Sequence, residues 1–283
     1  MVKNSPMTPE LPDILARIVA VKLREVEAKR PLRKSLERIA AAQRGQRRSF
    51  RQALVGGQFA PHGLPAEALR RRAVIAEIKQ ASPSKGLLCA DFNPARHARD
   101  YFAGGASALS VLTDKEFFRG SLGDLKTARA CVALPVLRKD FTIDEIDVVE
   151  SAASGADAIL LIAALLTSDQ IRRFQALADG YAMDALVEVH DRAELDVALA
   201  AGAHIVGVNN RDLRTFAVSL ETAEGLAPYI PADVLKVAES GIHSGADVER
   251  LMACGFQAFL VGEHLMTAPD VPAALRALTG RND

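Results

Sequence analysis

The 283-residue chain has no tryptophan, few aromatic residues, only three cysteines and no net charge. Cys89, Cys131 and Cys254 lie far apart without a CxxC pair, which argues against a disulfide framework or a zinc-binding site. The 35 basic and 35 acidic residues cancel, so the overall charge favours neither nucleic acid nor a membrane surface as a partner. No apolar run reaches the roughly 18 residues of a membrane-spanning helix, and the N-terminus is too polar for a signal peptide. We therefore expect a protein of the reducing cytosol.

Several catalytic motifs are also missing. The histidines show no HxH or HExxH spacing, and the chain contains no GxSxG nucleophile elbow and no P-loop. We accordingly expect no metal and no cofactor. His190 comes two residues after Glu188, and we interpret it as structural, pointing to the other side of the pleat or lying in the following loop.

The chain does contain eight short segments rich in aliphatic and β-branched residues. They start about 20 to 35 residues apart, which is the spacing of parallel strands joined by helices. Several are almost continuously apolar, as expected of strands covered on both faces. The segments are 73–79, 108–113, 135–139, 158–162, 185–189, 205–209, 234–239 and 258–262.

The residues between these segments repeat as well. Glycine comes shortly before four of the strands, where it can end the preceding helix in a left-handed conformation. Capping-box patterns suggest where helices begin, at Thr142 with Glu145, Thr167 with Gln170, and Asp191 with Glu194. Eight such units predict a (β/α)₈ TIM barrel. An open doubly wound sheet is the alternative, but it usually carries a glycine-rich phosphate fingerprint after its first strand, where this chain has SPSKG.

About 70 residues precede the first strand, and their apolar spacing predicts two helices. The first runs to Val26, with Thr8 as its N-cap and Pro9 at its first position, and the second covers 32–42. We expect residues 1–72 to form a helical extension packed on a catalytic barrel of residues 73–283, within one domain. The segment 44–51 carries four arginines, which we interpret as a solvated turn and helix face. A nucleic-acid patch there would need aromatic partners, and only Phe50 is nearby.

Catalytic residues of such barrels come from the carboxyl ends of the strands and the loops after them. Six of the predicted strands place charged or amide side chains there. Burying so many charges is costly unless they pair or serve a reaction. Ser240–Gly241 and Gly262–Glu263 follow the seventh and eighth strands, where backbone N–H groups commonly bind phosphate. We expect lysine and carboxylate acid–base chemistry on a phosphorylated compound. The polar rim residues are Glu77, Lys79, Lys139, Glu188, Asn209, Glu239 and Glu263.

Seven longer motifs surround these positions and the start of the N-terminal extension. They are DILARIVA at 13–20, VIAEIKQASPSKG at 74–86, LTDKEFFRGS at 112–121, PVLRKDF at 135–141, GVNNRDL at 207–213, VAESGI at 237–242 and LVGE at 260–263. In these motifs the sequence resembles the indole-3-glycerol phosphate synthase family, from about residue 13 to the C-terminus. One departure is Ile146–Asp147, where members of that family often have Tyr-Gln.

The resemblance implies a decarboxylating ring closure that yields indole-3-glycerol phosphate in tryptophan biosynthesis. It implies that Lys139 is the acid activating the substrate carbonyl, that Glu188 handles proton removal, and that Lys79 also serves as an acid. Glu77 and Asn209 correspond to residues that assist catalysis and hold substrate hydroxyls. By the same resemblance, Ser82, Arg211, Glu239, Ser240, Gly241, Gly262 and Glu263 line the substrate or phosphate site, and Phe118, Phe141, Leu160 and Leu260 form apolar walls.

The expected partner is thus a small phosphorylated substrate, bound by a monomer that contacts neither nucleic acid nor membrane. A phosphosugar isomerase of the same pathway is one alternative, and a non-catalytic barrel that binds a phosphorylated ligand is another. The presence of both Lys139 and Glu188 favours the lyase.

Overall fold

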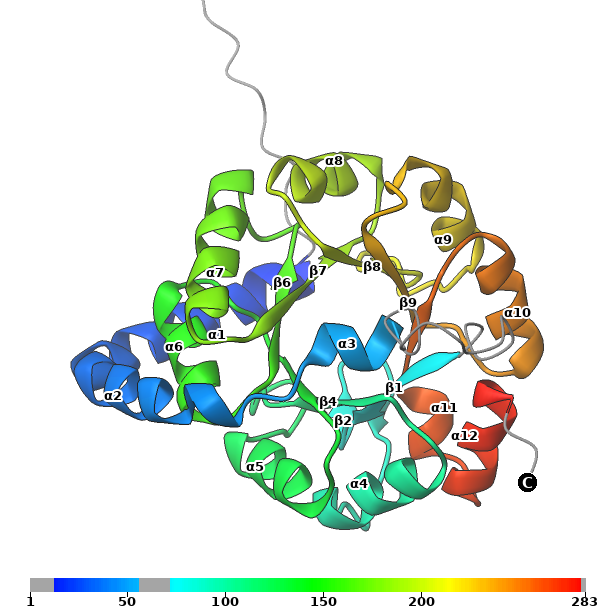
Figure 1. Ribbon diagram of the computed structural model, residues 1–283, viewed down its shortest axis with the longest axis horizontal. Coiled ribbons are helices and arrows are strands. Elements are labelled where there is room, and N and C mark those ends of the chain that lie inside the picture. Colours follow the sequence, from blue (N-terminus) through cyan, green and yellow to red (C-terminus); the bar gives the residue numbers. More distant parts are fainter. Residues whose placement is uncertain (1–12, 56–71, 281–283) are drawn as a thin grey trace, which may run out of the picture.

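The computed structural model describes residues 13–55 and 72–280. Eight parallel strands close into a barrel in the order β1-β10-β9-β8-β7-β6-β5-β4, with helices in a ring around it (Figure 1). The (β/α)₈ prediction is confirmed, and closure of the sheet excludes the open-sheet alternative. The barrel strands are β1 (Ala73–Ile78), β4 (Ala108–Leu112), β5 (Val136–Lys139), β6 (Ala158–Ile162), β7 (Asp184–Val189), β8 (Ile205–Asn209), β9 (Leu235–Glu239) and β10 (Ala258–Val261).

Each predicted strand is present, with ends that shift by at most one residue. A short antiparallel hairpin, β2 (Ala81–Ser82) with β3 (Gly86–Leu87), forms within the loop after β1. The helices are α1 (Asp13–Lys29), α2 (Arg33–Gln43), α3 (Phe50–Val55), α4 (Pro94–Ala103), α5 (Leu122–Cys131), α6 (Glu145–Ala153), α7 (Ser168–Gly180), α8 (Arg192–Ala200), α9 (Glu221–Leu226), α10 (Gly245–Ala253), α11 (Glu263–Met266) and α12 (Val271–Thr279).

The helix caps agree only partly with the sequence patterns. Thr167 and Gln170 form the predicted capping box of α7, and Asp191 caps α8 through the backbone N–H of Glu194. The box predicted at Thr142 is wrong, because α6 is capped two residues later by Asp144, with Asp147 completing the box. The two patterns overlap in sequence, and the loop after β5 determines which of them starts the helix.

The N-terminal extension reaches both ends of the barrel. Helix α3 lies across the amino-terminal end of the strands (Figure 1), where Phe50 and Leu54 are buried among interior barrel residues such as Ile75 and Leu137. Helix α2 packs on α6, and Gln43 Nε2 donates a 2.9 Å hydrogen bond to the carbonyl of Ala153. The predicted N-cap Thr8 and residues 9–12 of the first predicted helix lie outside the described residues. The domain boundary at 72/73 stays a prediction.

The sequence suggested that segment 44–51 is a solvated turn and helix face, and the structure corrects this interpretation. Arg44 is exposed, but Arg47, Arg48 and Arg51 are half-buried. Arg48 Nη1 donates to the carbonyls of Val132 and Leu134 at 2.8 and 2.7 Å. These carbonyls follow the end of α5 and need donors. The hydrogen bonds of Arg48 therefore attach the N-terminal extension to the amino-terminal end of the barrel.

Candidate active site

A pocket of about 390 Å³ lies at the carboxyl ends of the barrel strands. Every site residue predicted from the sequence lines this one pocket, although their individual roles stay predictions. These residues are Glu77, Lys79, Ser82, Phe118, Lys139, Phe141, Leu160, Glu188, Asn209, Arg211, Glu239, Ser240, Gly241, Leu260, Gly262 and Glu263.

Lys139 is the last residue of β5, and its ammonium lies between two carboxylates. Its Nζ contacts Glu188 Oε2 from β7 and lies 3.1 Å from Glu239 Oε2 at the end of β9. Glu188 and Glu239 are 3% and 1% exposed, so water does little to compensate either charge. The ion pairs with Lys139 offset the desolvation cost of burying these two carboxylates.

The three groups have perturbed pKa values in different directions. Burial alone would lower the pKa of Lys139, but Glu188, Glu239 and Glu77 outweigh it and raise that pKa well above its ordinary value. Burial works to raise the pKa of Glu188, yet the Lys139 charge and His190 hold it well below its ordinary value. Burial, reinforced by the charge on Glu188, raises the pKa of Glu239 to about 7. At neutral pH the site therefore holds a charged ammonium beside an ionised Glu188.

Two glycines make room for these carboxylates. A Cβ on Gly207 in β8 would lie 2.1 Å from Glu239 Oε1, and a Cβ on Gly262 would lie 2.3 Å from Glu77 Oε1. Gly262 was predicted as a phosphate-site residue, whereas Gly207 was not predicted at all. Its only sequence signal is a glycine inside an otherwise apolar strand, which often marks a close approach of another group.

A second lysine–carboxylate pair comes from β1 and the residue just after it. Lys79 Nζ lies 2.6 Å from Glu77 Oε1, and Glu77 is 4% exposed. Both side chains point to the same side of the strand, as their two-residue spacing predicted. The ammonium groups of Lys79 and Lys139 thus each lie beside a buried carboxylate and can serve two separate proton transfers.

Glu188 has two further polar neighbours. Asn209 Nδ2 donates to Glu188 Oε1 at 3.2 Å. His190 Nε2 lies 3.4 Å from the same oxygen, and His190 Nδ1 lies 2.9 Å from Glu194 Oε2. His190 follows β7, and its ring lies on the same side as Glu188, as two-residue spacing along a strand favours. The interpretation that it points to the other side of the pleat is therefore wrong.

The wall opposite the charged groups is apolar. The rings of Phe118 and Phe141 lie 6.1 Å apart, centroid to centroid, with a tilt of 39°. Leu160 and Leu260 complete the predicted wall. Helix α1 adds residues that sequence reasoning missed, because its apolar spacing predicted only a buried face: Ile14, Leu15 and Ile18.

The end of the pocket near β9 and β10 is where the sequence predicts the phosphate site. Ser240 and Gly241 both adopt positive φ angles, 67° and 77°. For serine this conformation is strained, and the two residues turn the chain sharply after Glu239. Arg211 Nη2 and Lys85 Nζ lie 3.5 and 3.4 Å from the Glu263 carboxylate, so cationic groups also reach this end. Lys85 was not predicted.

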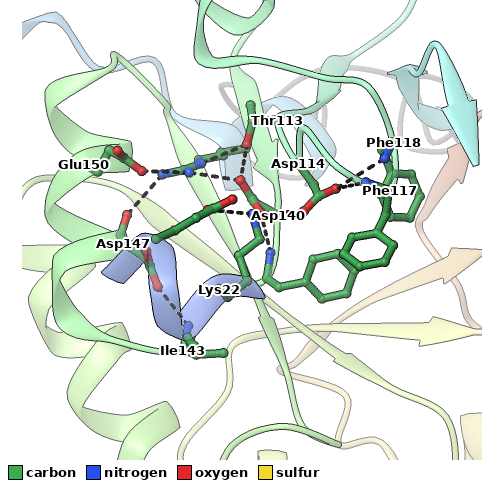
Figure 2. A network of polar contacts seen from close by, with 12 residues as sticks. Lys22, Thr113, Asp114, Phe117, Phe118, Asp140, Ile143, Asp147 and Glu150 are labelled. Atoms are coloured by element: carbon green, nitrogen blue, oxygen red, sulfur yellow. Dashed lines mark hydrogen bonds and ion pairs between the residues drawn. The ribbon is translucent and has the colours of Figure 1, made fainter. Parts of the chain in front are cut away.

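A buried ionic network connects helix α1 to the loops that carry the aromatic wall (Figure 2). Lys22 is 3% exposed, and its Nζ lies 3.0 Å from Asp114 Oδ2 and 2.8 Å from Asp140 Oδ1. Asp114 Oδ1 accepts hydrogen bonds from the backbone N–H groups of Phe117 and Phe118. Asp140 directly follows Lys139, so the network fixes both the wall and the end of β5.

Among residues 13–55 and 72–280, no group of three or more His, Cys, Asp or Glu side chains is arranged to hold a metal ion. Within those same ranges, no helix combines the length and apolarity needed to cross a membrane. Cys89, Cys131 and Cys254 are free thiols.

Comparison with known proteins identifies close sequence relatives. The family model for indole-3-glycerol phosphate synthase matches residues 15–278. Proteins of that name from Albidiferax ferrireducens and Azoarcus sp. are each 50% identical to this chain over 269 and 273 residues. The matches cover 94% and 95% of this chain and 98% and 99% of the two relatives.

Solved structures with the same fold are more distant in sequence. Thiamine phosphate pyrophosphorylase from Pyrococcus furiosus superposes with a TM-score of 0.54 at 18% identity, over 73% of this chain and 93% of that one. N-acetylmannosamine-6-phosphate 2-epimerase from Clostridium perfringens gives 0.56 at 16% identity, over 74% and 93%. At this identity the likeness shows the barrel fold alone.

Proposed function

The chain belongs to the indole-3-glycerol phosphate synthase family, and from this premise we propose how its pocket residues divide the reaction. The enzyme is a lyase of tryptophan biosynthesis. It closes the indole ring of 1-(2-carboxyphenylamino)-1-deoxyribulose 5-phosphate, releases carbon dioxide and water, and yields indole-3-glycerol phosphate.

The two ends of the pocket hold the two ends of the substrate. Backbone N–H groups of Ser240, Gly241, Gly262 and Glu263 bind the phosphate, with Ser82 and Arg211 beside them. The aromatic ring packs between Phe118, Phe141, Leu160 and Leu260. Fixing both ends bends the flexible chain between them, which brings the reacting carbons together before any bond forms.

Lys139 begins the chemistry by donating a proton to the C2′ carbonyl oxygen. The carbonyl carbon becomes electrophilic, and the aromatic carbon that bears the carboxylate attacks it. The iminium formed in the ring then accepts the electron pair of the breaking carbon–carboxylate bond, so that carbon dioxide leaves and aromaticity returns. Because the substrate's own nitrogen accepts these electrons, the step can proceed through the residues of this pocket.

Water is lost in the second half of the reaction. Glu188 takes the proton that must leave, and Lys79 donates a proton to the departing hydroxyl. Asn209 holds Glu188 at 3.2 Å, and Glu77 holds Lys79 at 2.6 Å. Asn209 and Glu77 also bind substrate hydroxyl groups.

The observation that carries this assignment is the charged ammonium of Lys139 in the pocket, between Glu188 and Glu239. We expect Lys139→Met to lower kcat by roughly 10²-fold or more, the scale of a lost general acid, while the protein still folds and binds substrate. Indole fluorescence follows turnover, and circular dichroism follows folding. Lys126→Met, at an exposed position of α5, is the matched control and should behave as wild type.

Retained turnover in folded Lys139→Met protein would remove Lys139 from the mechanism and leave Lys79 as the acid. If Lys139 only tied the strands together, the melting temperature would fall while the activity of each folded molecule stayed near wild type.

The remaining expectations about partners belong to the same proposal. The substrate is a small phosphorylated compound, and the enzyme acts as a monomer in the cytosol without nucleic acid or membrane partners. Its three free thiols are consistent with a reducing compartment. Sedimentation of the pure protein would test the monomer directly.

A further inference from the structure

His190 is a largely enclosed histidine that lies between two carboxylates, and the proposed mechanism does not use it. Its side chain is 11% exposed, and it lies between Glu188 at the end of β7 and Glu194 in the first turn of α8. Glu194 Oε2 lies 2.9 Å from Nδ1 and also accepts the His190 backbone N–H at 2.8 Å. Glu194 thereby fixes both the backbone and the ring of His190.

The other ring nitrogen faces the site. Nε2 lies 3.4 Å from Glu188 Oε1, and no described residue gives it a hydrogen bond. This separation is beyond the usual 2.7–3.2 Å of an N–H···O bond. In the resting site, Glu188 is drawn toward Lys139 on its other side through Oε2. The imidazole is therefore placed to donate to Glu188 Oε1, which accepts from Asn209, while Lys139 contacts the other oxygen, Oε2.

The surrounding charges favour a protonated ring. Burial alone would lower the pKa of His190, but Glu188 and Glu194 outweigh it and raise that pKa to about 10. Beyond Glu188 lies Lys139 from β5, with Glu239 of β9 and Glu77 of β1 on the far side of that lysine. The site thus pairs two cations, His190 and Lys139, with one shared carboxylate.

The Lys139 ammonium cannot keep its full contact with Glu188 while it donates to the substrate carbonyl. When its ammonium donates to the carbonyl, the contact with Glu188 weakens, and a carboxylate that is 3% exposed would lose its ammonium partner and keep only the amide of Asn209. We propose that His190 is a positioning residue for Glu188: its imidazolium takes over the carboxylate when Lys139 turns to the substrate, and keeps it ionised and in place for proton removal. This inference rests on the proposed roles of Lys139 and Glu188.

The test compares the pH profiles of kcat and kcat/KM in wild type and in His190→Gln. The kcat profile reports groups in the enzyme–substrate complex, and the kcat/KM profile reports the free enzyme. We expect the acid limb of kcat to move to higher pH by about one unit or more, the effect of losing a neighbouring cation. The acid limb of kcat/KM should move less, because Lys139 still holds Glu188 in the free enzyme.

Three further variants separate positioning from packing. His190→Lys keeps a cation and should restore the acid limb even where kcat is reduced. Glu194→Gln should shift the limb in the same direction but by less, since it loosens the ring without removing it. His97→Gln is the control: His97 is 5% exposed beside Cys89 and Phe92, so its loss should lower the melting temperature and leave both profiles unchanged.

A folded His190→Gln enzyme with unshifted profiles would overturn the inference, whatever its melting temperature. A shift of the same size in His97→Gln would overturn it too, because the effect would then follow from lost stability. Neither result touches the proposed roles of Lys139 and Glu188, which fail if the folded Lys139→Met or Glu188→Gln protein, respectively, keeps its turnover.

Discussion

At the scale of single residues, the pocket depends on two glycines, Gly207 and Gly262, as well as on the side chains that react. Glu239 occupies space that any Cβ at position 207 would fill, and Glu77 depends in the same way on position 262. Glu77, Lys139, Glu188 and Glu239 come from alternate strands of the closed barrel and converge on one pocket, so a displaced carboxylate has little room to find another position. The two glycines therefore act on the chemistry through the carboxylates that they admit.

Replacing Gly207 by alanine tests this dependence. The new Cβ would lie 2.1 Å from Glu239 Oε1 and 3.2 Å from Leu186 Cδ1, so Glu239 must move and its 3.1 Å contact with Lys139 is lost. We expect kcat to fall by roughly 10- to 10²-fold, the cost of a misplacement of about 1 Å. Gly225→Ala is the control, because a Cβ there meets nothing within 4 Å. Equal activity of the two variants would contradict the argument.

At the scale of helices and strands, the sequence predicted what depends on local pattern. The eight strands followed from continuous apolar runs, and the rim residues followed from their positions at strand ends. Contacts made over long sequence distances could not be predicted this way. No local sequence pattern indicates that Phe50 packs among the interior residues of the barrel, or that Lys22 pairs with Asp114 and Asp140. The orientation of the His190 ring also depends on Glu194, one turn into the next helix.

Helix α1 is the element whose contribution is easiest to measure. Lys22→Met leaves Asp114 and Asp140 buried without their shared ammonium, at 0% and 5% exposure. We expect the free energy of unfolding to drop by about 3–5 kcal/mol, as for other broken buried pairs. Denaturant unfolding of Lys22→Met beside Lys34→Met, at an exposed position of α2, measures the difference. Matching midpoints would show that the network adds no stability.

The whole molecule has no net charge, yet its charges are unevenly placed. Many of its acidic and basic residues pair inside the barrel rim and along the contact with α1, where composition alone could not place them. The fold thus concentrates titratable groups where burial changes their pKa values. Stability should therefore depend on pH through a few identified residues, although the formal charges cancel.

Glu239 and His190 both make the free energy of unfolding fall as the pH rises. The pKa of Glu239 is raised from 4.5 to about 7, and that of His190 from 6.5 to about 10. A group whose pKa is raised by folding contributes stability that is complete below its unfolded pKa. That contribution is lost as the pH rises through the folded value. The contribution of Glu239 to the free energy of unfolding should therefore be lost between pH 4.5 and 7. That of His190 should be lost between pH 6.5 and 10.

Urea unfolding of wild type, Glu239→Gln and His190→Gln at a series of pH values separates the two contributions. The difference in unfolding free energy between wild type and Glu239→Gln should fall as the pH rises from 4.5 to 7. The difference for His190→Gln should fall between pH 6.5 and 10, in each case by on the order of a few kcal/mol. Taking differences cancels the titration of groups that do not interact with the replaced residue. If the wild-type and His190→Gln curves run parallel over that interval, then Glu188 and Glu194 do not hold the imidazole in its charged form.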